Sequence, residues 1–314
     1  MEQNKNINDL TILDFAQGGN LSIAVDAFIT DRKASGLTKQ TIKFYQNYLT
    51  AFITYCDSLS IQNLKQINPD FIRRYLLSRE GKWNPGGIHA CFRSIRVFFR
   101  WLDFEDVMDP DWKNPILKVK APKVSNAPIE PIPLEDIEAL IETCKEGDKT
   151  GIRDKAIFLC LLDTGVRAQE FCDINLADVD LTTGNILIRM GKGRKPRTVF
   201  IGKKSRRALK SYLRLRQDKC PALFISLLGG RFTYVGLAQI LERRAKRAGL
   251  KKEPNLHDFR RAFALTMLRN GVNIFALQRL MGHADLSMLR RYLAQTDVDI
   301  EEAHLRGSPV DKSL

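Results

Sequence analysis

The sequence predicts a two-domain protein that is mainly α-helical and has a small antiparallel β region. Three observations support this prediction. The chain has 314 residues, about twice the ~150 residues of a typical domain. Apolar residues recur at three- and four-residue steps along most of the chain, as on the buried face of an amphipathic helix. Five of the twelve prolines fall between residues 114 and 133, and because proline fixes φ and removes a backbone donor, this range is predicted to be an extended linker.

The segment before the linker is predicted to be a small helical domain, residues 18–113, behind an N-terminal tail of residues 1–17. One helix begins near Thr38, with apolar residues from Ile42 to Cys56 on a single face. Further helices are predicted from about Leu21 to Ala34, from Pro69 to Ser78 and from Pro85 to Phe104. Each basic residue on their polar faces is, taken alone, an ordinary solvated charge. As a group they predict a DNA-binding surface, with Lys39, Lys43, Arg93 and Arg96 as candidate contacts.

The segment after the linker, residues 134–314, is predicted to be a larger mixed domain that ends in a tail. Alternating residues at 186–190 and 198–201 predict a β-hairpin, whose turn at 191–196 is rich in glycine and basic residues. Helices are predicted on both sides of it, near Leu134–Cys144, Gly151–Asp163, Lys204–Leu215, Tyr234–Ala248, Leu256–Asn270, Ile274–Met281 and Leu286–Ala294.

The charge of the chain predicts a polyanionic partner. Lysine and arginine number 50 against 36 acidic residues, a net charge of +14, and the pI is about 9.6. Either nucleic acid or a membrane surface would match this excess. Residues 189–216 contain twelve basic residues and no acidic one, a density that favours phosphate contacts over a solvated face. Arg194, Lys195 and Arg197 in this basic window are candidate DNA contacts.

Several signals lead us to expect a cytoplasmic protein without a membrane segment. The N-terminus is polar and lacks the apolar core of a signal peptide. The strongest apolar run, residues 156–162, is far shorter than the ~20 residues that span a bilayer. The six cysteines show no CxxC spacing, so buried reduced thiols are expected, with neither a structural metal nor a disulfide framework.

Four short segments carry the residues that can perform chemistry. Gly165 can end the buried helix before it, which leaves Arg167 just beyond a rigid scaffold. Lys192 lies at the tip of the predicted hairpin, where it reads as a phosphate-contacting lysine. His257 and Arg260 are three residues apart and share a helix face, near a helix N-terminus whose backbone N–H groups favour an anion.

The fourth segment is Gly282-His283, followed nine residues later by Tyr292. Nine steps along one helix would leave His283 and Tyr292 half a turn apart. Gly282 is instead predicted to end one helix, and Asp285 is predicted to cap the next. The side chains of His283 and Tyr292 can therefore meet from separate elements.

In this order, the arginine, the lysine, His-x-x-Arg, Gly-His and the tyrosine resemble the tyrosine recombinase (phage integrase) family. The resemblance covers about residues 132–294 by motif, and residues 21–101 more loosely resemble the helical core-binding domain of Xer-like members. The resemblance implies a mixed α/β catalytic domain, and it implies catalytic roles for Arg167, Lys192, His257, Arg260, His283 and Tyr292, with Tyr292 as the nucleophile. Departures from the family pattern include Val166, where leucine is common, and Arg261-Ala262, where His-Thr is frequent.

The function implied by the resemblance is site-specific DNA recombination of the integrase or resolvase type. Such an enzyme cleaves and rejoins double-stranded DNA at core sites through a 3′-phosphotyrosine intermediate, without a metal, another cofactor or ATP. The resemblance also implies a homotetramer on synapsed DNA, formed from free monomers. Two alternatives remain open at this point: a relaxing topoisomerase or telomere resolvase with the same chemistry, and a non-catalytic DNA-binding protein.

Overall fold

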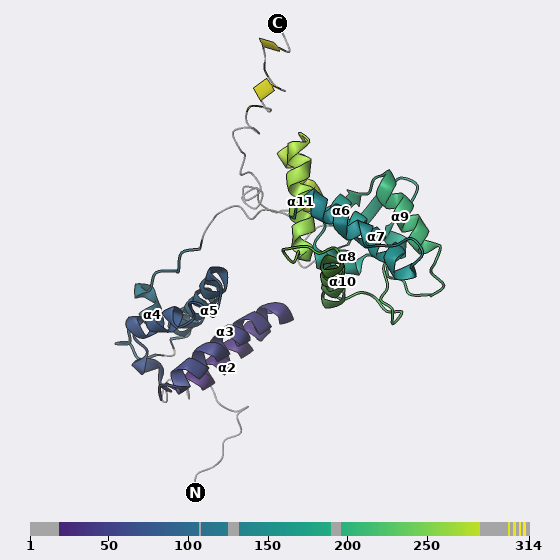
Figure 1. The fold of residues 1–314 in the computed structure, drawn as a ribbon. Coiled ribbons are helices and arrows are strands. Elements are labelled where there is room, and N and C mark those ends of the chain that lie inside the picture. The colour runs from purple at the N-terminus through teal and green to yellow at the C-terminus, as the bar shows by residue number, and fades with distance from the viewer. Residues whose placement is uncertain are drawn as a thin grey trace. The chain divides into compact units, whose positions relative to one another are not determined.

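The computed structural model describes residues 19–106, 108–124, 132–189 and 196–282, with residues 301, 304, 305, 308, 310 and 311 of the tail. The chain divides into two compact units, Met1–Asn126 and Ala127–Leu314. The described part is mostly helical and has one two-stranded antiparallel sheet, so the predicted fold class is confirmed (Figure 1). The predicted N-terminal tail, the tip of the hairpin and the predicted helix Leu286–Ala294 lie outside the described residues.

The first unit is built from helices that begin at local capping residues. Its elements are α2 (Leu21–Ala34), α3 (Lys39–Asp57), η2 (Leu64–Gln66), α4 (Pro69–Leu77), α5 (Pro85–Phe104) and η3 (Pro115–Lys118). Asn20, Thr38, Asn68 and Asn84 each accept a hydrogen bond from the first turn of the α-helix that follows, as N-cap side chains do. α2 and α3 lie side by side in Figure 1.

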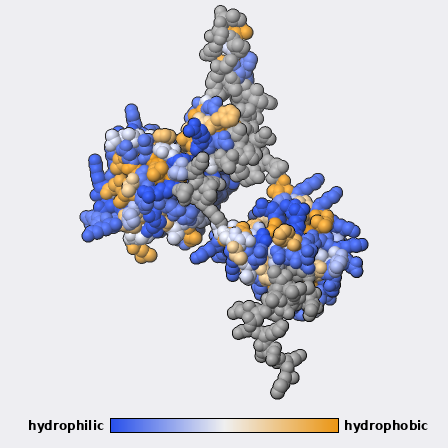
Figure 2. All heavy atoms as spheres, turned by 180° about the vertical axis from the view of Figure 1, so that it is seen from behind, coloured by the Kyte–Doolittle hydropathy of each residue, from blue (hydrophilic) through white to orange (hydrophobic). Residues whose placement is uncertain are grey.

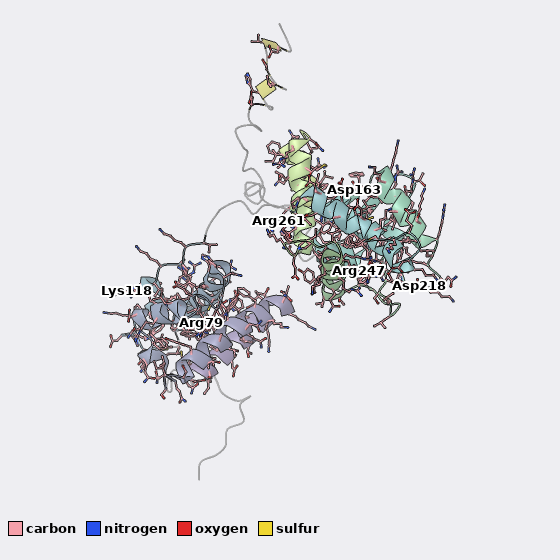
Figure 3. The ribbon with its side chains drawn as sticks, in the orientation of Figure 1. Arg79, Lys118, Asp163, Asp218, Arg247 and Arg261 are labelled. Carbon is pink, nitrogen blue, oxygen red and sulfur yellow. The ribbon has the colours of Figure 1, made fainter. Side chains whose placement is uncertain are left out.

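Aromatic side chains dominate the core of the first unit. The ring of Phe52 meets that of Tyr75 edge to face at 4.9 Å, and Phe28 meets Phe98 at 5.7 Å. Each such pair stabilises a core by roughly 0.5–1.5 kcal/mol beyond its buried area. The Arg79 guanidinium, labelled in Figure 3, lies over the Tyr75 ring at 4.9 Å. This packing gives the basic polar faces of α3 and α5 a rigid support.

The first part of the predicted linker belongs to this unit, which corrects the expectation of an extended chain over 114–133. η3 packs against α4 and α5, and Ile116 and Val119 are buried in the core of the unit. The Asn114 side chain donates to the backbone carbonyl of Phe99 at 2.8 Å, and Arg73 donates to that of Lys118 at 2.8 Å. Proline density predicted an extended chain, but it carried no information on the apolar side chains of Ile116 and Val119, which join the core.

The second unit surrounds a central helix. Its elements are α6 (Leu134–Glu142), α7 (Lys149–Thr164), α8 (Ala168–Asp173), η4 (Leu176–Asp178), β1 (Asn185–Ile188), β2 (Arg197–Phe200), α9 (Lys203–Leu213), α10 (Tyr234–Arg247), α11 (Leu256–Arg269) and α12 (Ile274–Met281). α7 packs against α9 and α11. The predicted hairpin is present: β1 and β2 are antiparallel, with Asn185 opposite Phe200 and Ile188 opposite Arg197.

Buried charges fix the helices around α7. The Asp154 carboxylate, 3% exposed, accepts hydrogen bonds from Arg153 and from Arg244 of α10. At the other end of α7, the Asp163 carboxylate (Figure 3) accepts from the backbone N–H of Gly202 at 2.6 Å and from the Ser205 hydroxyl at 2.7 Å. Asp163 thus holds the start of α9, where a helix dipole favours a negative charge.

All six cysteines are free thiols, and five of them are buried. Burial is the main cause that raises the pKa of Cys172 to about 11 and that of Cys91 also to about 11. These thiols therefore act as small apolar core residues. In the residues that the structure describes, no helix is long and apolar enough to cross a bilayer. On the face drawn in Figure 2, hydrophilic residues cover most of both units, with scattered hydrophobic patches between them.

Candidate active site

Arg167 lies in a short turn between two helices. α7 ends at Gly165, which has a left-handed backbone (φ +57°), and a Cβ atom at this position would lie 2.1 Å from the Phe263 ring. Both the backbone and the close contact with α11 therefore require glycine. Arg167 is the N-cap of α8, and its backbone N–H and its Nη1 each donate to the Glu170 carboxylate at 3.1 Å. Arg167 is thereby held beside the end of α7.

Arg260 connects the ends of two helices from its position in the first half of α11. Its Nη1 donates to the backbone carbonyl of Gly165 at 2.6 Å, and its Nη2 donates to that of Met281, the last residue of α12, at 2.8 Å. The residue is only 1% exposed. A guanidinium held in this way is fixed before any substrate binds.

His257 lies in the first turn of α11, at the capped end of the helix. Asn255 is the N-cap, and its side chain accepts from the backbone N–H of His257 at 2.9 Å. Asp258 completes the capping box by accepting from the backbone N–H of Asn255 at 2.8 Å, and its other oxygen accepts from Arg261 at 2.8 Å. Figure 3 shows Arg261 on α11. Asn255 therefore caps the start of α11, where the sequence predicted a helix N-terminus.

The pKa of His257 is lowered from its ordinary value. Partial desolvation of the imidazole is the largest cause, and the positive charges of Arg261 and Arg260 follow. Asp258 acts in the opposite sense, and Arg167 adds a smaller lowering effect. Arg167, His257 and Arg260 therefore lie in one region of the unit, and the lowered pKa of His257 favours its neutral imidazole.

Glu170 is the site residue that sequence reasoning missed. Burial alone would raise the pKa of its carboxyl, but hydrogen bonds from the Arg197 side chain and the Arg167 backbone outweigh burial and lower the pKa to about 2. The carboxylate binds Arg197 with Oε2 2.6 Å from Nη2. The three-residue step from Arg167 to Glu170 was the available signal, because it is the spacing between an N-cap residue and a glutamate at N3 that accepts from the N-cap backbone.

Carboxylates from outside the basic window pair with several of its residues. Arg189 pairs with Asp178, Arg197 with Glu170 and Arg216 with Asp218. Asp218 is labelled in Figure 3. The Arg197 side chain is only 13% exposed. The expectation that Arg197 contacts DNA therefore disagrees with its place in the structure, since its guanidinium is engaged by protein acceptors. Sequence spacing could not show this, because each partner lies outside the window.

The remaining predicted residues of the second unit lie outside the described residues. They are Lys192, Arg194 and Lys195 of the hairpin turn, and His283 and Tyr292 beyond α12. The structure does describe the residues on either side of the hairpin turn and the residue before His283. Gly282, which follows α12, has a left-handed backbone (φ +61°), so the predicted helix stop is confirmed. Ile188 and Arg197, which flank the hairpin turn, form a pair in the β ladder.

The predicted DNA contacts of the first unit lie on α3 and α5. Lys39, Lys43 and Arg93 are exposed, and Arg96 is half-buried. The Arg93 guanidinium lies over the Phe44 ring at 5.9 Å, an arrangement that keeps a cation fixed at a surface. A neighbouring hollow of about 690 Å³ is lined by polar side chains and by aromatic ones; they are Gln40, Lys43, Asn47, Lys82 and Asn84, with Phe44, Tyr48 and Trp83. It contains basic and amide side chains, which are the types that contact phosphates and base edges.

Within the described ranges, no group of three or more histidine, cysteine, aspartate or glutamate side chains is arranged to hold a metal ion.

Comparison with known proteins assigns the family. Residues 131–298 match the phage integrase family. The chain is 31% identical over 292 residues to the tyrosine recombinase XerC of Thermodesulfovibrio yellowstonii, covering 88% of this chain and 93% of that protein. It is 29% identical over 288 residues to XerD of Listeria innocua, covering 87% and 94%. The chain therefore belongs to the phage integrase family. It is an Xer-like tyrosine recombinase, an enzyme of the type that cleaves and rejoins DNA.

Solved structures share the fold. The integrase of the Tn1549 transposon, in complex with transposon right end DNA, has a TM-score of 0.73 at 20% identity, covering 91% of this chain and 98% of that one. The XerH recombinase bound to its difH substrate, in a post-cleavage complex, has a TM-score of 0.70 at 24% identity, covering 94% and 86%.

Proposed function

We propose that this protein is a site-specific recombinase that exchanges strands between pairs of DNA core sites in the cytoplasm, through a 3′-phosphotyrosine intermediate. The observation that carries the proposal is the convergence of Arg167, His257 and Arg260 at the ends of α7, α11 and α12. Structures of relatives bound to DNA support DNA as the partner. The basic faces of α3 and α5 in the first unit are the complementary surface, with Lys39, Lys43, Arg93 and Arg96 as contacts.

The two arginines would stabilise the transition state. When Tyr292 attacks the phosphodiester, negative charge concentrates on the non-bridging oxygens. Guanidinium groups match this geometry and stay charged at any physiological pH, and preorganised donors of this kind supply several kcal/mol. Because Arg260 is almost fully buried, the proposal requires an edge of its guanidinium to meet the phosphate when DNA binds.

Proton transfer would involve the other predicted residues. The Tyr292 phenol, with an ordinary pKa near ~10, needs a base, and His257 is suited to the role because its lowered pKa keeps the imidazole neutral. Lys192 would protonate the leaving 5′-oxygen, and His283 would hydrogen-bond the phosphate or orient Tyr292. The phosphotyrosine bond conserves the energy of the broken phosphodiester, so rejoining requires no ATP.

The C-terminal tail would couple cleavage to assembly. The tail alternates apolar and acidic residues between Asp297 and Leu305, and a segment this short is marginal as an isolated helix. A largely apolar groove of about 800 Å³ on the second unit, lined in part by Leu162, Phe200 and Met267 with Lys203 and Lys204 beside them, matches this chemistry. We propose that the groove receives the tail of a neighbouring protomer, which gives a cyclic tetramer on two sites from free monomers. The alternative is that the tail folds back on its own unit.

Covalent capture tests the proposed function. On a core site nicked next to the cleavage position, the protein should form a stable adduct because the short leaving strand diffuses away. Tyr292→Phe should abolish the adduct and leave DNA affinity within severalfold. Tyr234→Phe is the control, since Tyr234 is 49% exposed on α10 and should react normally. An adduct mapped to Tyr234, or the absence of any adduct on the nicked site, would refute the proposal.

Strand exchange between two sites distinguishes a recombinase from a topoisomerase. Supercoiled plasmids with one or two copies of the site should give recombinant circles only when two copies are present. Relaxation of the one-site plasmid without recombinants from the two-site plasmid would favour the topoisomerase alternative.

A further inference from the structure

The Glu170 carboxylate is shared by two arginines from separate parts of the chain. Arg167 donates to Oε1 at 3.1 Å, while Arg197 donates to Oε1 at 3.2 Å and to Oε2 at 2.6 Å. The two-pronged contact from Arg197 is the stronger, geometrically specific form of an arginine–carboxylate pair. The side chains of Arg197 and Glu170 are 13% and 10% exposed. The pair is therefore shielded from bulk water and bound in a single arrangement.

The third guanidinium nitrogen of Arg197 reaches a different element. Nε donates to the backbone carbonyl of Leu280, near the end of α12, at 3.0 Å. A Cβ atom on Gly282 would lie 3.0 Å from the same nitrogen, so Arg197 packs tightly against this turn. Each of its three nitrogens thus has a protein acceptor, and the side chain joins β2, α8 and the end of α12. The next residue in the sequence after Gly282 is His283.

We propose that Arg197 is a positioning residue for the recombination reaction. Through Glu170 it fixes the Arg167 guanidinium, and through Leu280 it fixes the turn that leads to His283. The inference rests on the proposed function, which assigns Arg167 and His283 to the phosphate. It replaces the DNA contact expected for Arg197 from the sequence, because all three nitrogens of this guanidinium already donate to protein acceptors.

The cost of losing this residue follows from geometry. Without Arg197, Glu170 loses its two-pronged partner, and Arg167 is then held by a carboxylate that can itself rotate. A misplacement of about 1 Å in a group that stabilises the transition state lowers the rate on the order of 100-fold. DNA affinity should stay the same, because the residues that bind the backbone elsewhere are untouched.

The experiment compares Arg197→Gln with a matched control, Arg216→Gln. The Arg216 side chain is also buried, 6% exposed, and paired with a carboxylate, but its acceptors lie in the loop 218–223. Three quantities are measured for each full-length variant: affinity for a half-site at several salt concentrations, the single-turnover cleavage rate at saturating protein on the nicked site, and the melting temperature. Arg197→Lys and Glu170→Gln serve as second variants if Arg197→Gln does not fold.

We expect Arg197→Gln to lower the saturated cleavage rate on the order of 100-fold, with an unchanged salt dependence of binding. Arg197→Lys should recover little of the rate, because an ammonium cannot reproduce the fork, and Glu170→Gln should share the defect. Arg216→Gln should lower only the melting temperature. If Arg197 contacted a phosphate, Arg197→Gln would instead reduce the slope of log affinity against log salt concentration by about 1. Arg197→Lys would then keep the contact, because an ammonium also binds phosphate.

A reduced slope for Arg197→Gln overturns the inference whatever the rate. A normal cleavage rate in folded Arg197→Gln also overturns it, since the role is then only structural. Absence of cleavage by the unsubstituted protein overturns the proposed function together with this inference. If the unsubstituted protein cleaves DNA and Arg197→Gln shows either the reduced slope or the normal cleavage rate, this inference alone is overturned.

Discussion

Replacing Gly165 by alanine should damage both the stability and the chemistry of the second unit. The left-handed backbone of Gly165 (φ +57°) costs a residue with a Cβ atom about 1–2 kcal/mol. The added atom would also lie 2.1 Å from the Phe263 ring, and overpacking of this kind costs about 1–3 kcal/mol. The free energy of unfolding of the unit should therefore fall by about 2–5 kcal/mol. For a unit of this size, residues 127–314, that loss corresponds to a melting temperature lower by about 4–20 °C.

Gly249 provides the matched control for this substitution. It also has a left-handed backbone (φ +66°), but a Cβ atom there would meet nothing within 4 Å. Gly249→Ala therefore incurs only the backbone cost, about 1–2 kcal/mol, and should lower the melting temperature by about 2–8 °C. The difference between the two variants isolates the contact between Gly165 and Phe263.

Circular dichroism and tryptophan fluorescence together form the assay. The chain has three tryptophans, at positions 83, 101 and 112, all in the first unit. Fluorescence therefore follows the first unit, while the helical signal follows both. Gly165→Ala should move the circular dichroism transition and leave the fluorescence transition in place. Its cleavage rate should also fall, because the Gly165 carbonyl accepts from Arg260. Equal melting temperatures for Gly165→Ala and Gly249→Ala would refute the reasoning.

Three further predictions concern the reaction itself. Arg261→Gln removes a positive charge that lowers the pKa of His257, so the pKa of His257 should rise. Because the base works in its neutral form, the acid limb of the plot of cleavage rate against pH should move to higher pH. An unmoved limb would exclude His257 as the base. Lys192→Ala should slow cleavage by roughly 10²–10⁴, and a substrate with sulfur as the bridging 5′ atom should recover most of the rate; equal impairment on both substrates would mean that Lys192 only binds phosphate. Deleting the residues after Gln295 should preserve binding to one half-site and remove cooperative binding and recombination, whereas normal recombination by the truncated chain would exclude the tail as the assembly device.

Local signals in the sequence predicted most of the helices. The helices over Leu21–Ala34, Pro85–Phe104 and Ile274–Met281 have the predicted bounds, because capping side chains and glycine stops act within a few residues. α8, by contrast, was not predicted. Its six residues, Ala168–Asp173, are too few to show a helical period. As a result, Glu170 was not recognised as a site residue.

Long-range pairings could not be predicted from the sequence. Glu170 and Arg197 are 27 residues apart, and Arg260 and Gly165 are 95 apart. Spacing along the chain says nothing about such contacts, which depend on how α7, α11 and the hairpin pack. Net charge has the same weakness. It indicated a polyanionic partner for the chain as a whole, but it did not separate arginines on the surface, such as Arg93, from those held inside, such as Arg197.

The position of Arg260 shows how local and long-range signals combine. Gly165 and Gly282 are both left-handed residues that end a helix. The last carbonyls of a helix have no partner within it and carry partial negative charge. Arg260 binds one such carbonyl at each stop, that of Gly165 and that of Met281. The glycines predicted from the sequence as simple helix ends therefore create the two acceptors that hold this arginine. Removing either glycine should misplace Arg260, even though neither glycine has a side chain to contact DNA.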